Sequence, residues 1–121
     1  MKKIFCFDID GVICARPNDI EHLGKKKYEQ CYQLQSTIDI INQLYDSGHT
    51  IKLFTSRGMS MYKGDLYIVH DELYEFTYNQ MKEFGVKFHE LILGKPAYDF
   101  IIDDKAINSK DMNSIKEFIN S

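Results

Sequence analysis

Residues 3–11 read KIFCFDIDG, an apolar run that ends abruptly at two aspartates and a glycine. A nearly continuous apolar run of this length is typical of a strand buried in a parallel sheet. Asp8, Asp10 and Gly11 then fall in the loop at the carboxyl end of that strand. This stretch predicts a first strand over residues 3–8 and directs attention to the residues that follow the other strands.

The rest of the chain alternates between helical and strand-like patterns of apolar residues. The predicted elements are helices over 28–46, 71–84 and 109–119 and strands over 50–55, 86–93 and 99–103. Residues 59–70 are rich in Tyr and Met and lack a period, so we expect a loop there. Strands that alternate with helices require crossover connections, which give a parallel sheet covered by helices on both faces. The predicted fold class is α/β, a three-layer α/β sandwich with a mainly parallel, Rossmann-like sheet.

Length and charge restrict the possible functions. The chain has 121 residues and a net charge of −3, which suits one domain over 1–121 and disfavours a nucleic-acid or anionic-membrane partner. Its three cysteines show no metal-site spacing and are expected to be reduced thiols. Residues 1–3 run directly into the first predicted strand, and no apolar stretch is long enough to span a bilayer. These features predict a cytoplasmic protein that does not enter the membrane.

Polar residues directly follow each predicted strand. In open α/β sheets, ligands bind outside the carboxyl ends of the strands, so these residues are expected to converge at one rim. They are Asp8 and Asp10, then Thr55, Ser56 and Arg57, then Gly94 and Lys95, and finally Asp103 and Asp104. Taken singly, each group has a structural alternative: the first two acids can cap a turn, Thr55-Ser56 can cap a helix, and Arg57 can form a surface ion pair.

Clustered carboxylates repel one another unless a cation compensates them. All-oxygen ligands suit Mg²⁺, which binds one or two protein carboxylates together with substrate phosphate. Beside such an ion, one carboxylate can attack phosphorus while a second handles the proton. Lys95 and Thr55 supply a cation and a neutral donor for the phosphoryl oxygens. The pattern therefore predicts phosphoryl-transfer chemistry.

Four segments resemble, in chain order, the four motifs of the haloacid dehalogenase superfamily: DIDGV (8–12), FTSR (54–57), GKP (94–96) and IIDD (101–104). The resemblance implies that Asp8 is the nucleophile, Asp10 the general acid and base, Thr55 the phosphate-binding hydroxyl, and Lys95 the cation that orders nucleophile and phosphate. It also implies Mg²⁺ ligands at Asp8, Asp10, Asp103 and Asp104, the contact at Asp10 being its backbone carbonyl. Gly11, Ser56 and Arg57 complete the expected phosphate- and substrate-binding set.

The gaps between these motifs are too short for the cap domain that members of this superfamily usually carry. The chain is therefore similar to the capless phosphatases encoded with bacterial capsule and surface-polysaccharide genes. The resemblance implies a small phosphorylated substrate, of which a sugar phosphate is preferred. Tyr and Met are favoured at interfaces, so a second copy of the chain is expected to cover the open site.

Two other functions remain open. A nucleic-acid 3′-phosphatase fits a capless enzyme that accepts large substrates, although the sequence offers no basic groove beyond the three lysines of residues 25–27. A receiver-like signalling domain, which stores a phosphoryl group, shares the fold class and the acid cluster. The order of its key residues differs, because Lys95 here precedes the Asp103-Asp104 pair.

Overall fold

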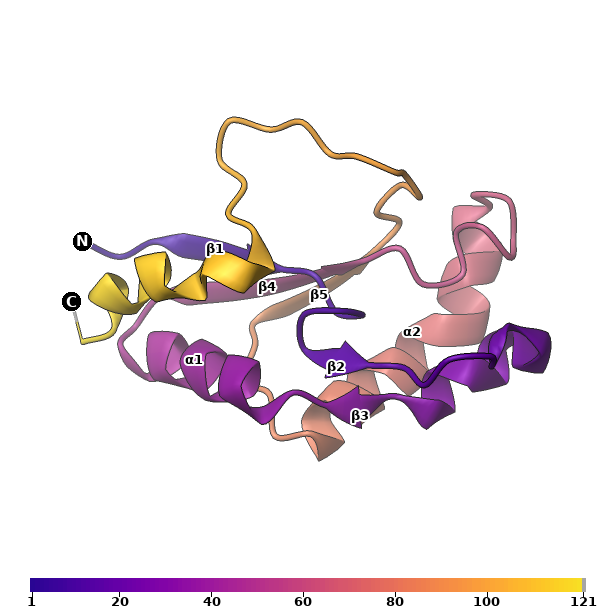
Figure 1. Ribbon diagram of the computed structural model, residues 1–121, viewed down its shortest axis with the longest axis horizontal. Coiled ribbons are helices and arrows are strands. Elements are labelled where there is room, and N and C mark those ends of the chain that lie inside the picture. The colour runs from indigo at the N-terminus through magenta and orange to yellow at the C-terminus, as the bar shows by residue number, and fades with distance from the viewer. Residues whose placement is uncertain (121) are drawn as a thin grey trace.

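Three parallel strands form the central sheet of the structure, a computed structural model that describes residues 1–120. They are β1 (Ile4–Phe7), β4 (Thr50–Thr55) and β5 (Glu90–Leu93), in the spatial order β1-β4-β5 (Figure 1). In this register Phe7 lies beside Leu53, and Leu53 lies beside Leu91. The parallel sheet confirms the α/β class. The strand predicted over 50–55 is confirmed to the residue.

Two long helices make the crossovers between these strands. Helix α1 (Gln35–Asp46) connects toward β4, which it contacts, and α2 (Leu66–Glu83) connects β4 to β5. The Asp65 side chain caps α2 by accepting hydrogen bonds from the backbone N–H groups of Tyr67 (3.1 Å) and Ile68 (3.3 Å). This cap starts α2 five residues before the predicted residue 71.

One face of the sheet is buried and the other is open. Side chains alternate between the two faces of a strand, and in β4 Ile51, Leu53 and Thr55 are buried while the residues between them are half-exposed. On the open face, Cys6 is exposed and Lys52 pairs with Glu90 at 3.5 Å. Helices covering both faces were expected. Within residues 1–120 helices cover only one face of the sheet. The three-layer arrangement is therefore not observed in this part of the chain.

The chain between β1 and α1 is more irregular than predicted. It forms β2 (Cys14–Ala15), the 3-10 segment η1 (Glu21–Gln30) and β3 (Tyr32–Gln33), with β2 and β3 paired antiparallel. The helix predicted over 28–46 is therefore wrong in its first turns. Gly24 interrupts η1 with φ 60° and ψ −137°, and Cys31 is extended so that the chain can pair with β2.

Residues 94–108 form an extended segment that leaves the sheet after β5 and arcs away from it before η2 (Ser109–Phe118) (Figure 1). The strand predicted over 99–103 is absent from the described chain. Phe100 is 87% exposed and Ile102 is 96% exposed. The predicted last helix is confirmed as η2, and the Asn108 side chain caps it by accepting from the Lys110 N–H (2.9 Å). None of the helices formed by residues 1–120 is long and apolar enough to cross a bilayer.

Candidate active site

A cavity of about 470 Å³ opens at the carboxyl ends of the three parallel strands. Its wall includes residues that follow β1, β4 and β5, as expected for an open α/β sheet. The expected site residues that line it are Asp8, Asp10, Thr55, Ser56, Arg57 and Lys95. The convergence predicted from strand-end positions is therefore observed for these six residues.

Asp8 and Lys95 form an ion pair inside this cavity. Lys95 Nζ lies 3.5 Å from Asp8 Oδ2, and the side chains are 11% and 34% exposed, respectively. The backbone N–H of Lys95 donates to the carbonyl of Thr55 (3.1 Å), which ties the loop after β5 to the end of β4. Burial lowers the pKa of Lys95, but Tyr98 and the Asp8 carboxylate outweigh this effect and raise it. Lys95 is therefore held as a cation beside an accessible carboxylate.

Asp10 is bound by the buried side chain of Arg57. Arg57 Nε donates to Asp10 Oδ2 (2.9 Å) and Nη2 donates to Oδ1 (3.0 Å), the two-pronged geometry that makes such pairs strong. The Arg57 side chain has no exposed area. Burial raises the pKa of Asp10, but the hydrogen bonds and charge of Arg57 outweigh burial and lower it. Arg57 thus forms a buried ion pair, whereas a substrate contact or a surface ion pair was expected.

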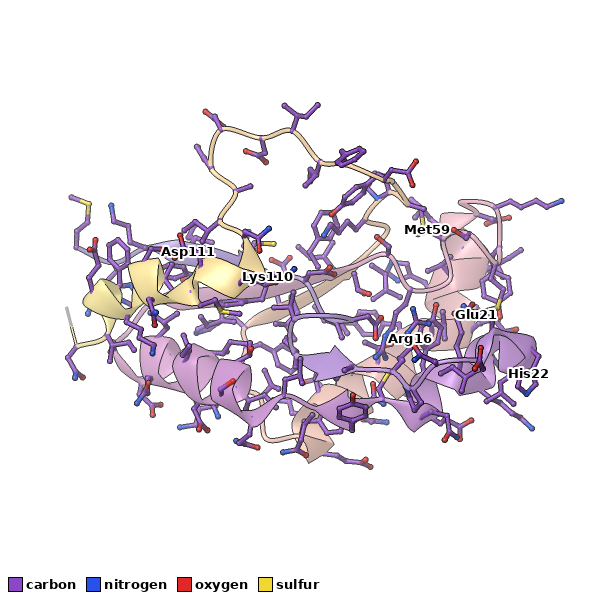
Figure 2. All side chains as sticks on the ribbon, in the orientation of Figure 1. Arg16, Glu21, His22, Met59, Lys110 and Asp111 are labelled. Atoms are coloured by element: carbon purple, nitrogen blue, oxygen red, sulfur yellow. The ribbon has the colours of Figure 1, made fainter. Side chains whose placement is uncertain are left out.

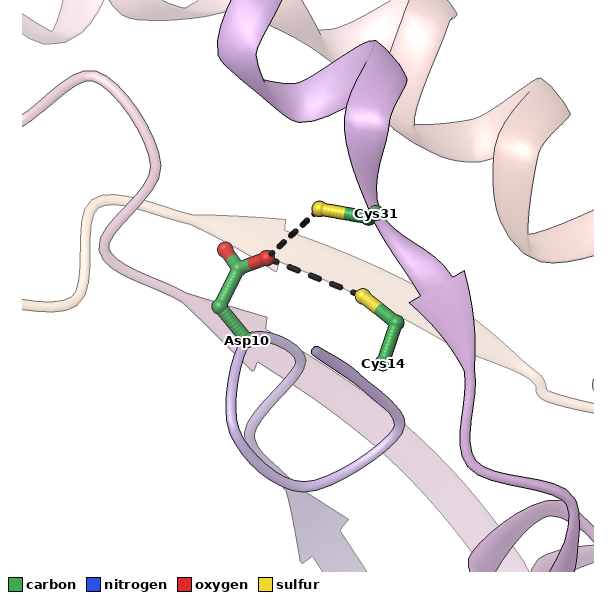
Figure 3. Close-up of side chains that lie close together, drawn as sticks. All are labelled: Asp10, Cys14 and Cys31. Carbon is green, nitrogen blue, oxygen red and sulfur yellow. Dashed lines mark hydrogen bonds between the residues drawn. The ribbon is translucent and has the colours of Figure 1, made fainter. Parts of the chain in front are cut away.

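Two buried thiols complete the surroundings of Asp10. Cys31 Sγ lies 3.4 Å and Cys14 Sγ 3.6 Å from Asp10 Oδ1, and Figure 3 shows both sulfurs directed at this one oxygen. Arg57 Nη2 also lies 3.6 Å from each sulfur. The three ligand atoms are within 4.8 Å of one another, close enough to hold a metal ion. The guanidinium already occupies the shared oxygen, however, and its positive charge opposes a cation there.

The remaining expected phosphate-binding groups have backbone partners. Thr55 Oγ1 accepts from the Arg57 N–H (3.1 Å), and Ser56 Oγ donates to the carbonyl of Pro96 (3.0 Å). Gly11 adopts φ 88°, a conformation that favours glycine, and its N–H donates to the Cys14 carbonyl (2.7 Å). Gly11 borders a neighbouring hollow rather than this cavity.

Asp103 and Asp104 do not reach the cavity in this structure. Both are exposed on the segment after β5, and Asp103 Oδ1 accepts from the Lys105 N–H (2.8 Å). They were expected at the sheet rim because a strand was predicted over 99–103. Without that strand, the chain does not bring them beside Asp8.

The cavity is also lined by residues that the sequence patterns did not identify as site residues. Four of them lie on one stretch of the chain: Arg16, in the connection between β2 and η1, and Glu21, Lys27 and Tyr28, in η1. Figure 2 shows Arg16 and Glu21 on the same side of the molecule, far from Lys110 and Asp111. The run of lysines over 25–27 was the one signal for this wall, and only Lys27 of that run lines the cavity.

No protein-family model matches the chain, and no curated protein matches its sequence significantly. Among solved structures, the chain is similar to the crystal structure of an MCSG target protein from Vibrio cholerae. The TM-score is 0.78, the sequences are 22% identical, and the match covers 98% of this chain and 97% of the other. Similarity at this identity shows a shared fold, so the chain belongs with small α/β domains of this architecture.

Proposed function

We propose that this protein is a magnesium-dependent phosphomonoester hydrolase that forms an aspartyl phosphate on Asp8. The observation that supports this most is the Asp8–Lys95 pair, 3.5 Å apart in a cavity at the carboxyl ends of three parallel strands. Of the two aspartates that follow β1, Asp8 has Lys95 beside it, whereas the Asp10 carboxylate is engaged by Arg57. A carboxylate in this setting can act as a nucleophile toward phosphorus.

In the proposed first step, a carboxylate oxygen of Asp8 attacks phosphorus while the bond from phosphorus to the ester oxygen breaks, and the departing ester oxygen takes a proton from solvent water. Water then attacks the aspartyl phosphate, which releases inorganic phosphate and restores the carboxylate. Lys95 neutralises charge on the phosphoryl oxygens in both steps. The lowered pKa of Asp10 keeps it ionised, the form that can accept a proton from the attacking water. Arg57 positions Asp10 for this role.

The expected Mg²⁺ ligands are only partly gathered around the cavity. Asp8 and the backbone at Asp10 are in place, whereas Asp103 and Asp104 are exposed on the segment after β5. Of the four expected ligands, the cavity therefore offers the Asp8 carboxylate and the Asp10 backbone. When bound, Mg²⁺ would neutralise the negative charge of the phosphoryl group.

We further propose that residues 99–103 pair with β1 in the metal-loaded protein and form a fourth parallel strand. β1 is an edge strand of the described sheet, and an unpaired edge exposes N–H and C=O groups that can accept another strand. The nearby segment exposes Phe100 and Ile102 almost completely. Pairing would bring Asp103 and Asp104 toward Asp8 and would widen the parallel sheet to four strands.

For the substrate we propose a small phosphorylated metabolite, with a sugar phosphate as the preferred class. A cavity of about 470 Å³ falls within the range of small-molecule sites. The cations in its lining are Arg16, Lys27, Arg57 and Lys95, which do not amount to the long basic groove that a nucleic-acid 3′-phosphatase would need.

The test is the variant Asp8→Asn, assayed for phosphate release from a panel of phosphomonoesters with and without Mg²⁺. We expect loss of turnover with an unchanged thermal unfolding transition, because the substitution removes the nucleophile's charge at nearly constant volume. Asp39→Asn, at an exposed position of α1, is the matched control and should keep wild-type activity. Wild-type turnover in Asp8→Asn would contradict the proposal. Stable accumulation of acyl phosphate without release of phosphate would indicate a receiver-like domain instead.

A further inference from the structure

One wall of the cavity gathers cations around one aromatic ring. Arg57 Cζ lies 4.7 Å from the centroid of the Tyr28 ring, Lys27 Nζ 5.4 Å and Arg16 Cζ 5.5 Å. Cations within about 6 Å of a ring centroid are attracted to its face. Three positive groups therefore surround a single side chain on this wall.

The ring itself is held firmly. Tyr28 is 5% exposed, and its hydroxyl oxygen accepts a hydrogen bond from the Gly58 N–H (3.0 Å). Gln80 Nε2 donates to the Tyr28 carbonyl (2.8 Å). Tyr28 is thus fixed to the loop after β4 and to α2, and it places the cations at a defined distance from the end of the sheet.

The three cations differ in how well they are compensated. Arg57 is neutralised by Asp10 through two hydrogen bonds. Arg16 and Lys27 share the carboxylate of Glu21, at 3.7 Å and 2.8 Å, and the Glu21 side chain is 72% exposed. An ion pair with so exposed a partner contributes little to stability, because water competes for its charged groups.

Arg16 keeps unused hydrogen-bonding capacity on this wall. Its Nη1 atom is buried and has no hydrogen-bond partner among residues 1–120. A buried donor without a partner is unfavourable and gains from an acceptor brought by a ligand. The Arg16 and Lys27 side chains are 30% and 14% exposed, so both are largely positioned before a ligand arrives.

From this geometry we propose that Arg16 and Lys27 form a second anion-binding site, which selects phosphomonoesters that carry a further anionic group such as a carboxylate. Glu21 occupies the site in the free protein and swings into solvent when the ligand's own anion replaces it. The inference rests on the proposed function, because the phosphoryl group is taken to lie between Asp8 and Lys95. Both groups line the same cavity as Arg16 and Lys27.

The test uses two probes that differ by one charge, 3-phosphoglycerate and glycerol 3-phosphate. We expect the wild-type protein to prefer 3-phosphoglycerate, measured as the ratio of the two KM values. Lys27→Met and Arg16→Met should each reduce that preference about tenfold, the size expected for one charge-assisted hydrogen bond. Lys26→Met, which removes a neighbouring exposed lysine outside the cavity, should keep the wild-type ratio.

Glu21→Gln provides a change of the opposite sign. Loss of the internal carboxylate should increase the preference for 3-phosphoglycerate, because the two cations no longer hold a competing anion. A purely structural role for the ion pairs would lower the affinity for both probes together. Equal preference in the wild-type protein, Lys27→Met and Arg16→Met would overturn the inference, as would an equal loss of affinity for both probes.

A binding measurement separates this inference from the proposed function. Calorimetric titration of both probes into Asp8→Asn protein reports affinity without turnover. If the wild-type protein hydrolyses neither probe but the preference in binding depends on Lys27, the anion site is supported and the phosphatase proposal fails. If both probes are hydrolysed with the same KM and Lys27→Met changes neither, the phosphatase proposal is supported and the anion site is overturned.

Discussion

At the scale of single residues, Arg57 is the side chain that connects the fold to the site. A guanidinium without exposed area is unfavourable unless its charge is compensated, and the two hydrogen bonds to Asp10 supply that compensation. Removal of one partner leaves the other as an unpaired charge in a buried setting. The pair therefore stabilises the loop after β1 and the loop after β4 in a fixed relation.

We expect Arg57→Leu to lower the free energy of unfolding by about 3 kcal/mol, the usual cost of breaking a buried ion pair from one side. Urea denaturation measures it. Arg16→Leu is the matched control, because its partner Glu21 is 72% exposed; a loss below about 1 kcal/mol is expected there. A result for Arg57→Leu within the error of the wild type would show that the pair does not stabilise the fold.

The same pair should make stability depend on pH in the acid range. Because the pKa of Asp10 is lower in the folded protein than in the unfolded chain, its contribution is complete above the unfolded pKa, near 4, and is lost as the pH falls through the folded value. The stability difference between wild type and Arg57→Leu should therefore shrink between about pH 5 and pH 2. Urea midpoints across this range test the sign. A difference that grows on acidification would contradict it.

At the scale of elements, the cap of α2 explains why that helix begins earlier than its apolar period suggests. Asp65 satisfies two backbone N–H groups in the first turn, which the periodicity of residues 71–84 does not reveal. Asp65→Ala should cost about 1 kcal/mol of unfolding free energy. Glu75→Ala, at an exposed position inside α2, is the control and should change stability by no more than about 0.5 kcal/mol. Equal effects of the two substitutions would exclude a capping role.

Elements that depend on local pattern were predicted well, and those that depend on a distant partner were not. β4 has the clear apolar run of a central strand, and its bounds agree with the prediction. The helix expected over 28–46 was too long, because residues 32–33 pair with β2 instead. Residues 99–103 have an equally apolar run but find no strand partner in this structure, so the pattern alone placed Asp103 and Asp104 incorrectly at the rim.

At the scale of the whole molecule, the sheet has one covered face, one open face and an unpaired edge at β1. Fully burying Phe100 and Ile102 would contribute roughly 1.5–3 kcal/mol for each side chain. Burial of these two side chains would therefore favour pairing of residues 99–103 with β1. Binding of Mg²⁺ at Asp103 would favour the same paired state.

Hydrogen exchange measured by mass spectrometry tests this closure. On addition of Mg²⁺ with inorganic phosphate, amides of residues 4–7 and 99–103 should exchange more slowly, because strand pairing protects them. Residues 35–46, in α1, should show no change and serve as the internal reference. The variant Asp103→Ala should abolish the protection. Protection that persists in this variant, or none in the wild type, would contradict the proposed fourth strand.

The sequence by itself determined the α/β class, the parallel strands β1, β4 and β5, and the meeting of Asp8, Thr55 and Lys95 at one rim. These follow from local apolar patterns and from the rule that parallel strands end at the same edge. Only the tertiary structure decided that Arg57 is buried against Asp10 and that Arg16 and Lys27 face the same cavity around Tyr28. The contacts of Arg57 with Asp10 and of Arg16 with Tyr28 join residues more than ten positions apart, and no spacing along the chain encodes which charged groups will share one buried wall.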